Sequence, residues 1–191
     1  MRKLAIICGV LCAMATLNAA QYATEVKNLY VDSKDSKVVG KLLPTTEVQV
    51  IKKENGRVLL AVEGYADTNS NLAVYFVPGK RILSVGLTKD SGIALKKQSS
   101  VQADGKTYNK VKIEAWSEDD ALSDDINGLL AQAKDMYEQN CSMCHGLHSV
   151  KEYTANQWPS MFKSMAGRTA IDKKDYQLVI EYLQKNAKDM K

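Results

Sequence analysis

Histidine and cysteine are scarce in this chain, which contains two histidines and four cysteines among 191 residues. Cys8 and Cys12 lie in the first twenty residues, so only Cys141 and Cys144 remain beyond that segment. A disulfide between two cysteines so close in sequence would close only a very small loop. The sequence therefore excludes a small fold that is held together by several disulfides.

A strong excess of charge is also absent. The chain has 26 Lys and Arg residues against 22 Asp and Glu residues, and no segment concentrates the basic ones into a stripe. This balance excludes a typical nucleic-acid-binding protein. Residues 22–116 also show no paired acids, glycine-rich phosphate loop or nucleophile with a base, so we expect no enzyme active site there.

Long hydrophobic segments are lacking as well. The apolar run from Leu4 to Ala15 follows Arg2 and Lys3 and precedes small residues that end at Ala20. Such a run is short for a membrane-spanning helix, whereas this order of segments is typical of a secretory signal. We predict a signal peptide at residues 1–20 and a periplasmic protein without a membrane span after cleavage. An uncleaved anchor is the alternative.

Residues 22–116 contain short runs rich in β-branched and aromatic residues, a pattern that predicts strands. Turn signals such as Asn55-Gly56 and Asp104-Gly105 separate these runs, and the second predicts a hairpin. Short strands at regular spacing favour a small β barrel.

Residues 117–125 are acidic and polar, and we predict a linker there. Beyond it, apolar residues recur at helical spacing in three segments, which begin near Ser123, Asn156 and Asp172. Residues 126–191 are therefore predicted to form an all-α unit of three helices. A unit of this size buries little core by itself and needs a group to pack around.

The stretch CSMCHGLHSV, residues 141–150, holds both histidines of the chain. Cys141, Cys144 and His145 form the pattern C-x-x-C-H, which in an exported protein indicates covalent attachment of haem c. Two thiols one helical turn apart can each form a thioether with a porphyrin vinyl group, and the adjacent imidazole can bind the iron. One motif predicts one covalent haem, which would complete the core of the three helices.

Other readings of this stretch fit less well. A thioredoxin-like redox pair expects a βαβ context, whereas helical patterns flank these cysteines. A zinc site that also used His148 would not have the usual ligand spacing. A structural disulfide would leave His145 without a role.

Met165 is the preferred second ligand of the iron, because it lies twenty residues beyond His145 and can reach the other face of the ring. Met161 lies one turn earlier on the same helix face and competes for this role, and an open position is the third possibility. Trp158 and Phe162 are predicted to pack against the porphyrin.

His148 is too close to His145 to cross the ring, and we expect it near solvent or a propionate. Arg168 and Lys163 could pair with the propionates. Together with Lys151 they could also attract an acidic partner, although solvated surface charge is an equal alternative.

Two regions resemble known families. Residues 29–65, with Gly40-Lys41-Leu42, a Pro-Thr turn and paired strands closing near Gly64, resemble bacterial SH3-like domains. Residues 126–191 resemble class I c cytochromes. Within that class they are similar to monohaem domains that serve periplasmic molybdenum reductases for trimethylamine N-oxide or dimethyl sulfoxide. The narrower resemblance is carried by residues 141–146, 154–159 and 182–187.

These resemblances imply an α+β multidomain fold, in which a small all-β SH3-like barrel at 22–116 precedes an all-α three-helix cytochrome c domain at 126–191. They also imply a redox carrier with no catalytic site. It would take single electrons from a quinol-oxidising complex or another cytochrome and pass them to the molybdenum reductase, with the SH3-like module docking a partner.

A haem-based ligand sensor or small peroxidase with an open sixth position is the alternative function. A third possibility is that the N-terminal module binds cell wall or another protein.

Overall fold

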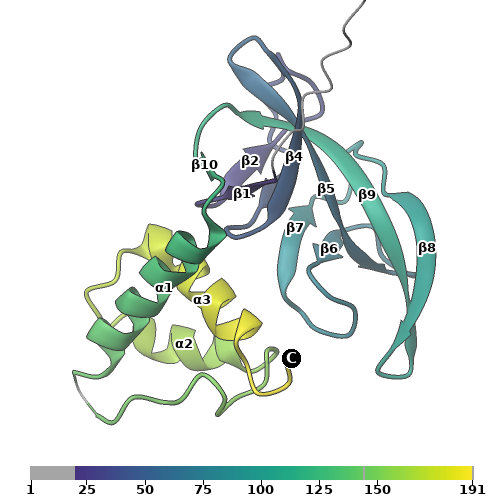
Figure 1. Cartoon of the computed structure of the whole chain (residues 1–191). Coiled ribbons are helices and arrows are strands. Elements are labelled where there is room, and N and C mark those ends of the chain that lie inside the picture. Colours follow the sequence, from purple (N-terminus) through teal and green to yellow (C-terminus); the bar gives the residue numbers. More distant parts are fainter. Residues whose placement is uncertain (1–19, 144, 191) are drawn as a thin grey trace, which may run out of the picture.

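The computed structural model describes residues 20–143 and 145–190, and it places a large sheet beside a smaller group of helices (Figure 1). The predicted signal peptide, apart from Ala20, and Cys144 lie outside the described residues. The strands are β1 (Gln21–Ala23), β2 (Lys27–Leu29), β3 (Gly40–Leu42), β4 (Glu47–Glu54), β5 (Arg57–Asp67), β6 (Ala73–Tyr75), β7 (Leu83–Leu87), β8 (Lys96–Ala103), β9 (Lys106–Glu118) and β10 (Leu122–Ser123).

All of these strands belong to one ten-stranded sheet with the order β10-β1-β4-β5-β6-β7-β3-β2, and β9 pairs with both β5 and β8. The pairing of β5 with β9 runs without interruption from Arg57 opposite Glu118 to Asp67 opposite Tyr108. An isolated bridge between Tyr30 and Trp116 joins the β2 end of the sheet to β9, so the sheet curls on itself. Its concave side encloses a core of aliphatic side chains.

The predicted turns are present where the sequence placed them. Asn55-Gly56 connects β4 with β5, and Asp104-Gly105 connects β8 with β9. All four of these residues have positive φ values, between 48° and 73°. Asn-Gly and Asp-Gly pairs are favoured in two-residue hairpins because this turn needs left-handed backbone at both positions.

The α+β multidomain prediction is wrong in its two components. Among the described residues, 35% lie in strands and 22% in helices, so this part of the protein is mostly β, with a curled sheet in place of a small SH3-like barrel and no all-α cytochrome domain. Strand patterns alone do not reveal how a sheet closes, and here β5 and β9, with 11 and 13 residues, are too long for the short-stranded barrel that we expected.

The helical part consists of α1 (Ile126–Cys141), α2 (Trp158–Ala166), the short 3₁₀ helix η1 (Lys173–Asp175) and α3 (Tyr176–Lys185). Asp125 caps α1, because its carboxylate accepts a hydrogen bond from the Gly128 amide at 2.8 Å. Pro159 occupies the first turn of α2, where its missing N–H costs little. In the described part of the chain, no helix is long and apolar enough to cross a membrane.

The helices have a core of their own, separate from that of the sheet, and one side chain from the connection between β6 and β7 enters it. Ile82, in the connection between β6 and β7, is fully buried among side chains of the three helices. Gln184 of α3 donates hydrogen bonds to the carbonyl oxygens of Arg81 and Ala155, at 3.2 Å and 2.7 Å. The Arg81 amide donates to the Asn156 side chain at 2.7 Å.

A second group of polar contacts joins α3 to the sheet. The ammonium of Lys185 donates to the backbone and side-chain oxygens of Thr45, at 3.0 Å and 2.6 Å, and lies 4.3 Å from the centre of the Phe76 ring. Glu181, one turn earlier on α3, is 1% exposed. Burial raises the pKa of Glu181 from its ordinary value of 4.5 to about 7, although the Lys185 charge opposes this shift. We call Thr45, Glu181 and Lys185 the polar joint.

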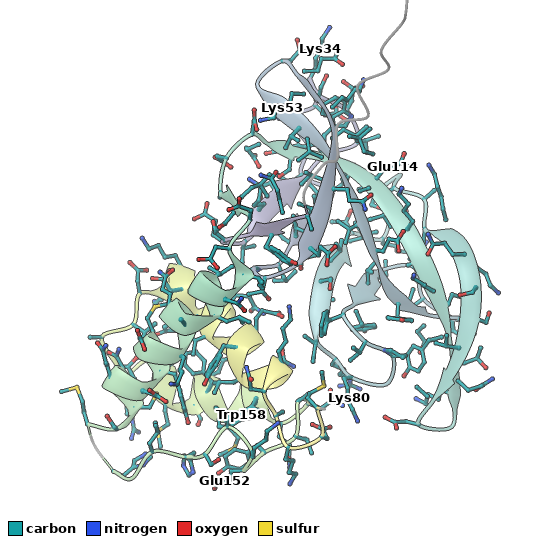
Figure 2. All side chains as sticks on the ribbon, viewed as in Figure 1. Lys34, Lys53, Lys80, Glu114, Glu152 and Trp158 are labelled. Atoms are coloured by element: carbon teal, nitrogen blue, oxygen red, sulfur yellow. The ribbon has the colours of Figure 1, made fainter. Side chains whose placement is uncertain are left out.

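Lys80 precedes β7 and lies where the sheet meets the helical part, close to the C-terminal end of the described chain (Figure 2). Its ammonium is 3.1 Å from Asp189 and 3.4 Å from Asp104. The Asp189 carboxylate also accepts a hydrogen bond from the Ala155 amide at 2.7 Å. Asp189 therefore connects the loop before β7, through Lys80, with the residues that precede α2, through Ala155.

Candidate haem site

Cys141 is the last residue of α1 and lies one turn beyond Tyr137 on the face that is turned towards α2. Leu129, Ala133 and Tyr137 are the buried residues of this helix, so the pattern of apolar residues that predicts the helix also orients Cys141. The Cys141 side chain is half-buried, and burial raises the pKa of its thiol. Cys144 lies outside the described residues, so its position relative to Cys141 remains a prediction.

His145 begins the segment that returns from α1 towards α2. Its Nδ1 is 2.8 Å from the Gly146 carbonyl oxygen, and its ring contacts the ring of His148 edge-to-face with 5.4 Å between centroids. The Nδ1 atom of His148 lies 2.9 Å from a carboxylate oxygen of Glu152. The His148 side chain is therefore oriented by Glu152, which follows it in the same segment.

Helix α2 presents two kinds of apolar side chain to this region. Trp158 and Phe162 are 2% and 4% exposed, whereas Met161 and Met165 are 38% and 43% exposed. The helix ends at Ala166, directly after Met165. Partly uncovered methionines on a helix that otherwise buries its apolar face indicate a surface that another group can cover.

A mainly apolar cavity of about 190 Å³ opens between α1, α2 and the segment that carries His145. Five of the six predicted cofactor-binding residues line it, namely Cys141, His145, Trp158, Phe162 and Met165. The alternative ligand Met161, the second histidine His148 and Arg168 line it too. Lys163 is not among the lining residues, and the ammonium of Lys151 is directed to the carbonyl oxygens of Ala187 and Met190.

Tyr137, Asn140, Ser164 and Thr169 also line the cavity, and the sequence argument gave them no role in the site. Tyr137 could have been found from its spacing, because a residue one turn before Cys141 shares its helix face. The other three are small or polar residues without a pattern that would distinguish them from surface positions.

The donor set of this cavity fits haem c. A thiol, two imidazoles and two thioethers face one space, which is lined mainly by apolar and aromatic side chains. Imidazole and thioether groups are the usual axial ligands of c-type haem iron, and cysteine thiols are its attachment points. The described residues contain no cluster of three or more His, Cys, Asp or Glu side chains that could hold a metal ion by themselves.

Comparison with known proteins places the chain among cytochromes. A family model described as "TorC third cytochrome c domain" matches residues 16–122. The "Cytochrome c-type protein TorC" of Escherichia coli strain K12 is 29% identical over 171 residues, which are 88% of this chain and 44% of that protein. The "Cytochrome c-type protein TorY" of Haemophilus influenzae is 27% identical over 180 residues, 90% of this chain and 46% of that protein. No solved structure matches this chain.

The matched ranges differ in a way that bears on the site. The family model covers the region of the sheet and ends before the helices. The alignment with TorC covers 88% of this chain, whereas the residues that follow position 145 make up a larger share of the chain than the uncovered part. The alignment therefore includes residues 141–145. The chain spans less than half the length of these relatives. Since the family model covers more than half of the chain, this protein belongs to the family of the TorC third cytochrome c domain.

Proposed function

We propose that this chain is a periplasmic electron-transfer cytochrome with one covalent haem c at residues 141–145. The observation that carries the proposal is that Cys141 and His145 of the motif line one mainly apolar cavity together with Met165 of α2. Family membership and the C-x-x-C-H motif support the same cofactor independently of this geometry. A bound haem supplies an iron that accepts and releases one electron.

The residues of the chain have distinct roles in this proposal. Cys141 and Cys144 would hold the haem through thioethers, and His145 and Met165 would be the ligands of its iron. Trp158 and Phe162, which are almost fully buried, keep water from the inner wall of the cavity. Arg168, at the cavity margin, offers a cation for a propionate.

The proposed partner is a periplasmic reductase of trimethylamine N-oxide or dimethyl sulfoxide, with a quinol-oxidising complex or another cytochrome as the electron donor. Support comes from similarity to proteins named TorC and TorY and from the resemblance of residues 141–146 and 154–159 to cytochrome domains of such systems. No catalytic residue is assigned to this chain, because the partner carries out the chemistry on the terminal acceptor.

Replacement of the two methionines tests the axial ligand. We expect the ferric wild-type protein to be low-spin with the weak far-red band of methionine-to-iron ligation. Met165→Ala should lose that band and become high-spin, whereas Met161→Ala should keep it, because only Met165 is proposed to bind the iron. The optical spectrum of each purified protein checks this. A band that persists in Met165→Ala and disappears in Met161→Ala would assign the ligand to Met161.

Electron delivery tests the partner. The ferrous protein should be reoxidised rapidly by a trimethylamine N-oxide reductase in the presence of its substrate, and only slowly when either is omitted. Stopped-flow absorbance of the haem measures both rates. A high-spin wild-type protein that binds carbon monoxide and is not reoxidised by the reductase would contradict electron transfer and favour the ligand-sensor function.

A further inference from the structure

We propose that Tyr137 and Trp158 form an aromatic clamp that positions the segment bearing His145. This inference rests on the proposed function, since it assigns positioning residues to the proposed haem site. We call residues 145–150, all of which the structure describes, the motif loop. It follows the end of α1 along the chain (Figure 1), and its two histidines, His145 and His148, line the cavity.

The clamp holds the motif loop by two side-chain hydrogen bonds to its backbone. The Tyr137 hydroxyl donates to the His148 carbonyl oxygen at 2.8 Å, and the Trp158 indole N–H donates to the Val150 carbonyl oxygen at 3.0 Å. Tyr137 belongs to α1 and Trp158 to α2, so the loop is fixed from both helices. The motif loop has no regular secondary structure, so these two donors replace the backbone partners that a helix or strand would supply.

The two donors are themselves held in place. Tyr137 is 4% exposed, and its ring contacts the ring of Trp158 edge-to-face with 6.0 Å between centroids. Burial raises the pKa of Tyr137 well above its ordinary value, so its hydroxyl keeps its proton and remains a donor. Two rings that pack on each other inside a core have few rotamers, and their donors point in fixed directions.

A series of ring contacts connects Trp158 with His145 and so restricts the orientation of the His145 ring. The ring of Trp158 contacts Tyr153 at 5.0 Å between centroids, Tyr153 contacts His148 at 5.5 Å, and His148 contacts His145 at 5.4 Å, each edge-to-face. His145 itself is exposed, and among the residues that the structure describes its ring has a polar contact with the adjacent Gly146 carbonyl oxygen only. The orientation of the proposed axial ligand therefore depends on neighbours that the clamp holds.

The clamp predicts a local effect of a single hydroxyl. Tyr137→Phe keeps the ring contact with Trp158 and removes only the bond to the His148 carbonyl oxygen. In the ferrous holo-protein, amide hydrogen exchange across the motif loop should rise about fivefold to tenfold, since one buried hydrogen bond contributes about 1 kcal/mol. The electron paramagnetic resonance lines of the ferric protein should broaden, because His145 then samples several orientations.

Tyr30→Phe is the matched control. The Tyr30 hydroxyl also donates a hydrogen bond inside the protein, to Glu118 at 2.5 Å, but it lies in the sheet, far along the chain from the motif loop. This variant should leave exchange in the motif loop and the resonance spectrum as in the wild type. An equal response of both variants would indicate a general loss of stability and would overturn the clamp.

Two further outcomes separate the clamp from the proposed function. Wild-type protein without covalent haem would overturn the function itself. Covalent, low-spin wild-type protein together with unchanged exchange in Tyr137→Phe would overturn the clamp alone. If Tyr137→Phe yields no holo-protein, Trp158→Phe, which removes the bond to Val150, is measured in the same way, and unchanged exchange there also overturns the clamp.

Discussion

The double variant Cys141→Ala/Cys144→Ala is expected to contain no covalently bound haem, a complete loss relative to the wild type. Thioether attachment needs both the C-x-x-C-H pattern and its two thiols, and no other cysteines remain beyond the first twenty residues. Haem staining after denaturing electrophoresis and the mass of the intact protein measure this loss. Without haem the cavity would be empty, so the melting temperature should fall as well.

Met143→Ala is the appropriate control for this variant, since Met143 lies between the two cysteines and its side chain is highly exposed. It should retain full haem attachment. Haem that survives denaturation in the double variant would place the attachment elsewhere and would contradict the assignment of residues 141–145.

Lys185→Met is expected to lower the free energy of unfolding by about 2 kcal/mol at pH 8. About 1 kcal/mol comes from the hydrogen bonds to Thr45, and at most about 1.4 kcal/mol comes from the lost charge partner, because Glu181 can take up a proton near pH 7. The variant removes the Lys185 charge, which favours the ionised form of the buried Glu181 carboxyl, and both hydrogen bonds to Thr45. Thr45 has a φ of 61°, which is strained for a β-branched residue, so these bonds also stabilise an unfavourable backbone. Urea unfolding measures the loss.

The effect of this variant should depend on pH in a defined direction. Burial raises the pKa of Glu181 above its unfolded value, so between about pH 4.5 and 7 the folded carboxyl keeps a proton that the unfolded chain releases. Rising pH therefore favours unfolding in this range, and the loss of Lys185 strengthens that trend. At pH 5 the cost should fall to about 1 kcal/mol, which reflects the lost hydrogen bonds to Thr45.

Two further variants sharpen this test. Lys188→Met removes an exposed lysine one turn nearer the C-terminus and should change stability little at either pH. Glu181→Gln combined with Lys185→Met should recover part of the loss at pH 8, because the amide carries no charge to be left unpaired. A pH-independent cost of Lys185→Met, unaffected by Glu181→Gln, would show that the two side chains do not interact.

The local patterns of the sequence were informative where one short segment contains the whole signal. Asn55-Gly56 and Asp104-Gly105 specified hairpin turns, because few other residue pairs adopt left-handed backbone twice in succession. The spacing of Leu129, Ala133 and Tyr137 specified α1 and its buried face. The C-x-x-C-H motif specified the proposed cofactor, because its thiols and imidazole must be adjacent to attach and bind one haem.

The sequence did not predict how these segments assemble. It suggested a small barrel, whereas β5 pairs with β9 along its whole length in a curled ten-stranded sheet. It also gave no sign that Ile82 enters the core of the helices. Such contacts join residues up to 140 positions apart, as between Thr45 and Lys185, and no local pattern records them. Sheet closure, the polar joint and the Tyr137–Trp158 clamp are therefore decided by tertiary packing, in which buried polar groups must find partners wherever the fold brings them.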